Sequence, residues 1–435
     1  MTYIEEYYEW IKEHPNRVGK KVKTMYEKLV KDLKTPKQVS FFNKATGENE
    51  THVYVFDEKK SLRCIHFCER YCKQSKGKWN GKPLKLQLFQ KAFLQALFGF
   101  VDKDTGFRKY RKAILFVARK NGKSVLASAI ATYMLVADYE GGAEIYSVAT
   151  KRDQSKIVWD EAKKMIKKSP ALSKSIRCLV GGIYYDKADA VFRALASDSN
   201  SLDGLNAHLV VADETHAWKD KNLLDVMFDS MSAREQPLLL ETSTMGTIRE
   251  NVFDIEYNYA AQVIDGIKED ETLLPIIYEL DDEKEWTNEE CWFKANPALN
   301  VIKSMKDLRD KVERAKNNPI ELVNLLCKDF NIRQNSINAW LSFDELNNEA
   351  IYNEWKNCYC IGGCDLSSTT DLTCASLLGV VKGKIYVKQM YWIPTNALEK
   401  KVIEDKIPYD KWLKSGYLRL SGENKIDYHD ITKWF

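Results

Sequence analysis

The sequence lacks the features of a membrane or secreted protein. No apolar run approaches the roughly 20 residues that a membrane-spanning helix requires. The strongest run, residues 113–118, has only the length of a strand. The first residues do not show the basic-then-apolar order of a signal peptide. We therefore expect a cytosolic protein without a membrane partner.

The sequence also lacks a strong excess of charge of either sign. Its 66 lysines and arginines against 62 acidic residues give a formal net charge of +4. This near-balance excludes a histone-like polycation, although it does not exclude a local basic groove. The apolar fraction of 44% is ordinary for a globular protein, and 435 residues predict two or three domains.

A disulfide framework is a third absence that we expect. The ten cysteines are unevenly spaced, and a cytosolic chain of this size normally keeps its thiols reduced. Cys64, Cys68 and Cys72 would share one helix face, with His66 nearby. We expect these thiols to line a buried stripe, because zinc ligands usually come in pairs from two separate segments. A metal site is the alternative.

Apolar patterning divides the chain into four segments. Residues 1–75 repeat near helical spacing and predict a helical N-terminal segment. Residues 76–280 alternate short apolar runs with amphipathic stretches, which indicates an α/β domain with a parallel sheet covered on both faces. Residues 281–339 read as a helical linker, and residues 340–435 as a strand-rich unit.

The expected strands are short. They include residues 114–117, 145–148, 209–212 and 238–240 in the second segment, and residues 359–363, 372–381 and 385–392 in the last, with Lys382, Gly383 and Lys384 as a hairpin turn.

The first of these strands leads into a candidate phosphate-binding loop. Residues 117–124 follow a buried strand and open a helix over residues 125–136, which is the setting that a P-loop requires. Lys123 would neutralise the β- and γ-phosphates, and the Ser124 hydroxyl would hold Mg²⁺. Val117 stands where the motif usually has its first glycine, and Gly-Lys-Ser alone is often just a turn.

A second strand supplies the acids that such a site needs. Residues 209–212 are apolar and are followed at once by Asp213 and Glu214. Two carboxylates at the end of a buried strand are costly to desolvate unless a cation meets them. Asp213 can hold Mg²⁺ with its water shell, and Glu214 can polarise the attacking water. The two halves together predict a nucleotide hydrolase.

Further segments accompany this loop in a fixed order. They are residues 194–197, 202–208, 213–218, 234–238, 242–246, 292–297 and 363–367. With residues 119–124, they resemble the large terminase subunit of tailed bacteriophages over roughly residues 85–375. The resemblance implies a motor that hydrolyses ATP, translocates viral double-stranded DNA into a procapsid through a portal ring, and cuts the concatemeric DNA.

The resemblance also implies roles for individual residues. Arg119, Lys120, Asn121 and Gly122 would contact the nucleotide together with Lys123 and Ser124. Gln90 resembles the residue that reads the adenine edge upstream of the loop, although residues 88–90 are also typical of a helix start.

Three further residues would serve catalysis and coupling. Thr244 belongs to residues 242–244, which resemble the segment that relays hydrolysis to movement, and ordinary turns use the same residue types. Arg119 and Arg234 are candidates for stabilising charge in the transition state. Ser201, Leu202 and Asp203 stand where some relatives carry an arginine, which leaves the arginine finger unassigned.

The last segment resembles the first strand of an RNase H-like nuclease. Asp365 ends that strand and Asp371 follows it, as candidate ligands for Mg²⁺ or Mn²⁺. A two-metal site needs about three or more carboxylates, and without the resemblance both acids read as turn caps. The later acids fall in lysine-rich helical or turn segments. We therefore expect a partial nuclease domain that binds at most one metal weakly and does not cleave DNA.

The expected partners follow from the same resemblance. They are double-stranded DNA, the portal of a procapsid and a small terminase subunit, in the cytoplasm of a bacterial host, with a homo-oligomeric ring on the portal and a monomer in solution as a further state. Basic residues interleaved with aromatics offer a diffuse DNA signal: Lys76, Lys78, Lys82 and Lys85 around Trp79, and Lys103, Arg108, Lys109, Arg111 and Lys112 before the first strand. Most such side chains only solvate a surface.

Two other classes compete with the packaging motor. A helicase-type or restriction-type DNA translocase would share the nucleotide core, but a helicase would be expected to supply a second ATPase lobe, and residues 340–435 carry no phosphate loop. A non-catalytic prophage remnant that binds nucleotide is the second alternative. ATP turnover, with Glu214→Gln as control, separates these classes.

Overall fold

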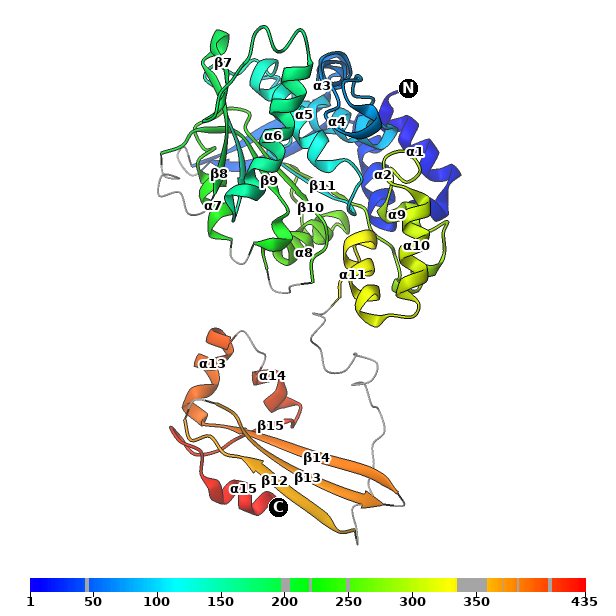
Figure 1. The fold of residues 1–435 in the computed structure, drawn as a ribbon. Coiled ribbons are helices and arrows are strands. Elements are labelled where there is room, and N and C mark those ends of the chain that lie inside the picture. Colours follow the sequence, from blue (N-terminus) through cyan, green and yellow to red (C-terminus); the bar gives the residue numbers. More distant parts are fainter. Residues whose placement is uncertain are drawn as a thin grey trace. The chain divides into compact units, whose positions relative to one another are not determined.

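The computed structural model describes residues 1–43, 47–196, 204–218, 221–247, 251–334, 358–369, 371–381, 383–405 and 409–435. Ser201, Leu202, Asp203 and Lys382 lie outside the described residues. The chain divides into two compact units, Met1–Ala339 and Trp340–Phe435 (Figure 1).

The first unit is built on an eight-stranded sheet. Its strands lie in the order β11-β4-β10-β9-β5-β8-β7-β6, and all neighbours from β11 to β8 are parallel. The strands β7 and β6 extend it antiparallel. The bounds are β4 Lys112–Phe116, β5 Glu144–Ala149, β6 Arg177–Cys178, β7 Ile183–Tyr185, β8 Ala190–Ala196, β9 Ala207–Asp213, β10 Leu238–Ser243 and β11 Leu273–Ile277. The predicted parallel sheet is confirmed.

Helices cover both faces of this sheet. Alternate residues of a strand point to opposite faces, so Leu115 and Leu209 pack with helices α1 to α6, whereas Ile114 packs with α8 and Val210 with α7. The helices are α1 Tyr3–Glu13, α2 Lys20–Lys34, α3 Glu58–Tyr71, α4 Leu88–Gly99, α5 Lys123–Val136, α6 Arg152–Lys168, α7 Asn222–Asp229 and α8 Val252–Ile264. Burial on both faces explains why these strands read as continuous apolar runs.

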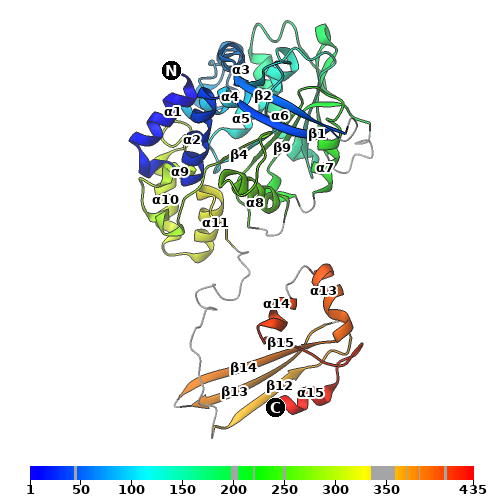
Figure 2. The same ribbon diagram turned by 180° about the vertical axis from the view of Figure 1, so that it is seen from behind.

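The N-terminal segment is helical only in part, so the expectation of helix throughout residues 1–75 is wrong. Lys37–Asn43 (β1) and Glu48–Phe56 (β2) pair antiparallel, and β2 also pairs with Phe100–Asp102 (β3). Figure 2 shows β1 and β2 as two long strands. Residues 37–56 are rich in β-branched and aromatic side chains, which favour a pleated strand over a helix.

Residues 281–334 are helical, as expected, but they are not a free linker. The helices α9 Trp292–Ala295, α10 Met305–Ala315 and α11 Pro319–Phe330 share a core with Ala118 of the phosphate loop. This segment therefore packs against the loop and forms part of the first unit.

The second unit contains a four-stranded sheet in the order β12-β13-β14-β15. Its strands are β12 Cys360–Asp365, β13 Thr373–Val381, β14 Lys384–Ile393 and β15 Leu418–Leu420. The helix α15 (Tyr428–Trp434) contributes to a core with Trp392, and α13 (Leu398–Asp405) and α14 (Tyr409–Lys414) to another with Ile393. The three predicted strands are confirmed.

Cys64, Cys68 and Cys72 are fully buried along α3. They line the apolar stripe that their spacing predicts, with the first two sulfur atoms 3.9 Å apart. Among the described helices, none is both long and apolar enough to cross a membrane.

Candidate functional site

The phosphate loop joins β4 to α5 at the carboxyl edge of the sheet. Gly122, with φ 84°, is the N-cap residue just before α5, and Lys120 also has a positive φ of 66°. Val117, at the position of the missing glycine, is fully buried, and its N–H donates to Ser243 O on β10 at 3.2 Å. The loop therefore makes its left-handed turns at Lys120 and Gly122 and has no need of one at residue 117.

Asn121 braces the loop from within. Its amide Nδ2 donates to Ala118 O at 2.9 Å and to Asn296 Oδ1 at 3.0 Å, and its Oδ1 accepts from Ala298 N at 3.1 Å. Asn296 Oδ1 also accepts from the buried Lys303 ammonium at 2.7 Å. The Asn121 side chain therefore fixes the loop against residues 296–303. The expected contact of Asn121 with a nucleotide stays a prediction, which its backbone N–H would meet.

Lys123 and Ser124 meet the two acids that end β9. Lys123 Nζ lies 3.0 Å from Glu214 Oε1, and Ser124 Oγ lies 3.4 Å from Asp213 Oδ2. Asp213 also accepts from Thr242 Oγ1 of β10 at 2.6 Å. The structure thus brings together both halves of the site that the sequence suggested, because parallel strands place their carboxyl ends at one edge.

The two acids differ in their electrostatics. Burial and the adjacent Glu214 charge raise the pKa of Asp213 above its ordinary value. Burial opposes ionisation of Glu214 as well, but the hydrogen bond from His216 and the Lys123 charge hold its pKa well below the ordinary value. Asp213 is therefore a buried acid that a cation would stabilise, whereas Glu214 is already compensated.

His216 is a site residue whose role the sequence reasoning missed. Its Nδ1 lies 2.9 Å from Glu214 Oε2 and 3.2 Å from Ser243 Oγ, at the end of β10. Gly246 approaches the ring so closely that an added Cβ would lie 2.9 Å from His216 Cδ2. The signal was present in residues 213–218, where a histidine follows the acids by two positions on a tight turn.

Gln90 faces a cavity of about 440 Å³ beside the loop. Its Oε1 accepts from Gln87 N at 3.0 Å, as part of the cap of α4. Gln90 Nε2 lies 3.4 Å from an ideal Cβ at Gly122. The cavity is lined by Gln74, Trp79, Lys82, Pro83, Leu84, Lys85, Gln87, Gln90, Gly122, Val125, Val301 and Ile302. A mostly apolar cavity with a few amide groups suits a nucleobase.

The basic residues expected to follow DNA are distributed differently from the prediction. Lys82 and Lys85 line the cavity beside Gln90. Lys109 and Lys112 are largely buried and pair with Glu271 and Glu256, at 2.7 and 2.5 Å. These two lysines therefore stabilise the first unit from inside and offer no DNA contact.

The structure places the remaining catalytic candidates apart from one another. Thr244 is fully buried just after β10, and its hydroxyl has no partner among the described residues. Arg119 is exposed on the outer side of the loop, where it lines a cavity with Lys328 and Asp329.

Arg234 lies at the opposite edge of the sheet. It donates to Asn206 O at 3.1 Å, Gly141 O at 3.0 Å and Gly142 O at 2.7 Å, and pairs with Glu140 at 3.0 Å. These contacts hold it at the amino ends of β5, β9 and β10. Arg234 is therefore not part of the nucleotide site of its own chain, because a strand length separates the two edges.

The acids of the second unit do not form a comparable centre. Asp365 ends β12, where it is exposed, and Asp371 is exposed in the turn before β13. The Asp371 N–H donates to Ser367 Oγ at 3.1 Å. Within the ranges that the structure describes, no group of three or more His, Cys, Asp or Glu side chains could hold a metal ion.

The fold and this site define a P-loop nucleotide hydrolase joined to a second, strand-rich α/β unit. Two family models match the chain: "Terminase large subunit, ATPase domain" over residues 88–262 and "Terminase large subunit, endonuclease domain" over residues 267–435. The chain belongs to the large terminase subunit family, whose members have ATPase and endonuclease activities.

The chain is also similar to two curated proteins and to one solved structure. The large terminase subunit of Enterobacteria phage HK97 is 28% identical over 379 residues, which cover 85% of this chain and 72% of that protein. Its crystal structure matches with a TM-score of 0.56, over 86% of this chain and 77% of the other. Protein YmfN of Escherichia coli (strain K12) is 27% identical over 247 residues, which cover 53% of this chain and 54% of YmfN.

Proposed function

We propose that this chain is the ATP-hydrolysing motor subunit that translocates viral double-stranded DNA into a procapsid. The observation that carries the proposal is the meeting of Lys123 and Ser124 with Glu214 and Asp213 at one edge of a parallel sheet, in a chain of the large terminase family. The family supplies the packaging function, and the geometry supplies the residues that would use ATP.

The loop and the adjoining cavity would hold the two ends of ATP. The triphosphate would lie at the N-terminus of α5, where free backbone N–H groups and the helix dipole favour negative charge. Lys123 would leave Glu214 for the β- and γ-phosphates, because a polyanion attracts the ammonium more strongly than one carboxylate. The base would enter the cavity of about 440 Å³ beside Gln90.

The donor set fits a magnesium ion. Asp213 is buried with a raised pKa, and the hydroxyls of Ser124 and Thr242 lie against its two oxygens. Carboxylate and hydroxyl oxygens are the ligands that Mg²⁺ prefers. When bound, Mg²⁺ would neutralise charge on the phosphate oxygens. Ser124 and Asp213 would hold it, and Thr242 would orient the Asp213 carboxylate.

Glu214 would position the attacking water and accept its proton. Once Lys123 has turned to the phosphates, His216 keeps the carboxylate in place through Oε2 and leaves Oε1 for water. His216 also contacts Ser243 on β10. A change at the γ-phosphate could thus reach residues 242–246 through Glu214 and His216, and Thr244 would be displaced with them. We propose this chain of contacts as the link between hydrolysis and movement.

Exposed Arg119 would act on charge at the loop, either in its own site or in a neighbour's. The wider assembly follows from the family: double-stranded DNA as the cargo, a portal and procapsid as the dock, a small terminase subunit as the partner, and a ring of copies in the cytoplasm of a bacterial host. In the second unit, Asp365 and Asp371 would bind at most one Mg²⁺ or Mn²⁺ ion, and only weakly, because no third ligand joins them among the described residues.

The test is ATP turnover with and without duplex DNA, in the parent and in Glu214→Gln. General-base catalysis contributes about 10²–10⁴-fold, so we expect turnover to fall by that factor while nucleotide binding persists. Glu235→Gln, an exposed acid of the same unit, is the control and should turn over ATP like the parent. A parent that binds ATP but neither hydrolyses it nor responds to DNA would overturn the motor assignment.

A further inference from the structure

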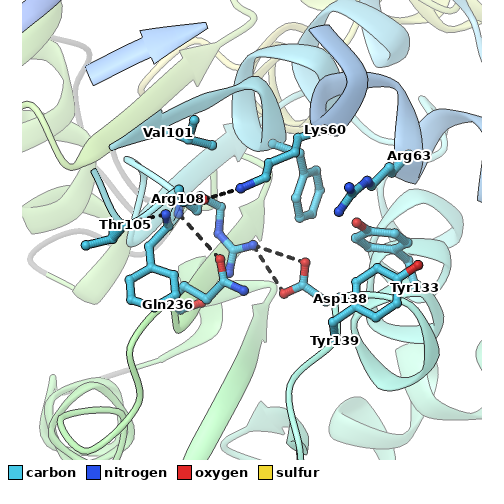
Figure 3. A pocket seen from close by; sticks show the side chains of 12 residues that line it. Lys60, Arg63, Val101, Thr105, Arg108, Tyr133, Asp138, Tyr139 and Gln236 are labelled. Carbon is cyan, nitrogen blue, oxygen red and sulfur yellow. Dashed lines mark hydrogen bonds and ion pairs between the residues drawn. The ribbon is translucent and has the colours of Figure 1, made fainter. Parts of the chain in front are cut away.

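A second cavity, of about 270 Å³, lies at the amino edge of the sheet in the first unit (Figure 3). It is lined by Lys60, Arg63, Phe98, Val101, Thr105, Gly106, Phe107, Arg108, Tyr133, Asp138, Tyr139 and Gln236. Three cations and one acid face this space. The nucleotide residues belong to the opposite edge, so this cavity is a separate feature.

Asp138 and Arg108 neutralise one another at the floor of the cavity. Arg108 NH1 lies 3.3 Å from Asp138 Oδ2, and His208 Nε2 lies 2.9 Å from the same oxygen. Burial would raise the pKa of Asp138, but Arg108 and His208 hold it below the ordinary value, so the acid is ionised. Arg108 is itself buried, and its Nε–H has no partner in the described part of the chain.

Lys60, which is half-buried, and Arg63, which is exposed, are the two other cations of the cavity. Neither pairs with a carboxylate within the described ranges of the chain. Lys60 Nζ uses one of its three N–H donors on Gly106 O at 2.5 Å. Arg63 lies over the exposed ring of Tyr139, with Cζ 5.6 Å from the ring centroid. The cavity therefore carries an excess of about two positive charges, which an anion would offset.

We propose that this cavity binds a phosphate group through Lys60 and Arg63. A guanidinium presents a planar fork that matches two phosphate oxygens, and an ammonium adds a point charge. A phosphate monoester carries about −1.5 to −2 charges, which matches the excess. The volume is near the lower end of ordinary ligand sites, roughly 300 Å³, and thus suits one phosphate with its sugar.

The phosphate could come from a small molecule or from the DNA backbone. Tyr139 is 82% exposed beside Arg63, and an exposed ring offers a stacking surface to a sugar or base. The DNA source rests on the proposed motor function, whereas phosphate binding as such does not.

The test uses the full chain carrying Lys123→Ala, so that the nucleotide loop contributes little to phosphate binding. Lys60→Ala/Arg63→Ala is compared in this background with Lys59→Ala, an exposed lysine of the same helix. Calorimetry with inorganic phosphate measures the anion site. Fluorescence anisotropy with a short duplex, at several salt concentrations, measures DNA binding. Thermal unfolding of each variant checks that it is folded.

We expect the double variant to lose phosphate binding and Lys59→Ala to keep it. If DNA is the source, the salt slope of log affinity falls by about 1 for each phosphate contact removed. If DNA binding is unchanged while phosphate binding is lost, the source is a free phosphate compound. Equal phosphate binding in both variants, or none in the Lys123→Ala parent, overturns the proposal. ATP turnover of chains with Lys123 intact tests the motor function independently.

Discussion

Asp213 and Asp365 each end a strand that the sequence predicts, yet Asp213 is buried in the first unit and Asp365 is exposed in the second. Asp213 is 5% exposed, and hydroxyls from the loop and from β10 lie against its oxygens. Asp365 is exposed at the end of β12, which is an edge strand of its sheet among the described residues. The comparison teaches that an acid at a strand end becomes a site only where neighbouring strands and loops enclose it.

The two sheets explain this difference. All seven residues of β9 are buried because parallel neighbours flank it and helices cover both faces. In contrast, β12 pairs only with β13 among the described strands, and five of its six residues are exposed. A buried carboxylate needs hydrogen-bond donors or a cation beside it, since burying its charge without them costs free energy.

The largest effect on ATP turnover is expected when each of the two acids is replaced separately by asparagine and the two variants are compared. Asp213→Asn should lower ATP turnover by about 10²–10³-fold, because metal-borne charge stabilisation is worth several kcal/mol. Asp365→Asn should leave turnover unchanged. Steady-state hydrolysis at increasing Mg²⁺ measures both, and similar losses in the two variants would break the comparison.

The next effect concerns stability. Asn296 is fully buried and links Asn121, Lys303 and the backbone of α11, whereas Asn396 is exposed and bonds to Asn424. Asn296→Ala should lower the free energy of unfolding of the first unit by about 2–4 kcal/mol, because it strands several buried polar groups.

Asn396→Ala is the matched control, with an expected change within about 0.5 kcal/mol. Calorimetric unfolding of the two variants compares them directly. A smaller loss for the buried asparagine than for the exposed one would contradict the role given to residues 296–303 behind the loop.

A smaller effect should follow from the two histidine–carboxylate pairs. His216 is largely buried against Glu214, and His429 is exposed against Asp427 at 3.3 Å. A hydrogen bond to a charged group contributes about 1.5–3 kcal/mol, so His216→Ala should lower turnover by about tenfold or more. His216→Asn, which keeps a donor near the position of Nδ1, should recover part of it.

His429→Ala should have no effect on turnover, since its pair lies in solvent. Single-turnover hydrolysis separates the chemical step from product release in these variants. If the rate of the chemical step in His216→Ala equals that of the parent, the histidine only fills space beside Gly246.

The smallest effect is expected for nicking of plasmid DNA. The prediction made from the sequence is that this chain shows no metal-dependent cleavage, so Asp365→Asn should behave like the parent. Gel electrophoresis with Mg²⁺ and with Mn²⁺ provides the measurement. Nicking by the parent that Asp365→Asn removes would show that the second unit assembles a working nuclease centre.

Much of the fold was predictable because its signals are local. The apolar runs at β4, β9 and β10 and the turn at Gly122 identify a phosphate loop and its acids from spacing alone. The expectation of helix over residues 37–56 is wrong because strand pairing specifies this segment. β1 pairs with β2, and β2 also pairs with β3, which lies 44 residues beyond it.

Contacts across the fold also decide the positions of two site candidates. The hydrogen bonds of Arg234 go to residues 140–142, which hold it away from the nucleotide loop, and the Asn121 side chain bonds to residues 296–298. The spacing of residues 213–218 signals the nearness of His216 to Glu214, whereas the contact of His216 with Ser243 on β10 has no signal in the sequence. Residue spacing predicts contacts between residues that are close in the sequence, but it does not predict contacts between residues that only the fold brings together.

The hydrogen bonds of Arg234 have a mechanical consequence. One guanidinium ties the segments that precede β5, β9 and β10, so the amino ends of these strands form a stiff base. The opposite edge of the sheet carries the loop after β4, the acids after β9 and residues 242–246 after β10, and in the proposed mechanism the contacts of these segments change when ATP binds. If hydrolysis displaces these strands, the displacement should be smallest at their amino ends, which Arg234 holds together, and largest at their carboxyl ends.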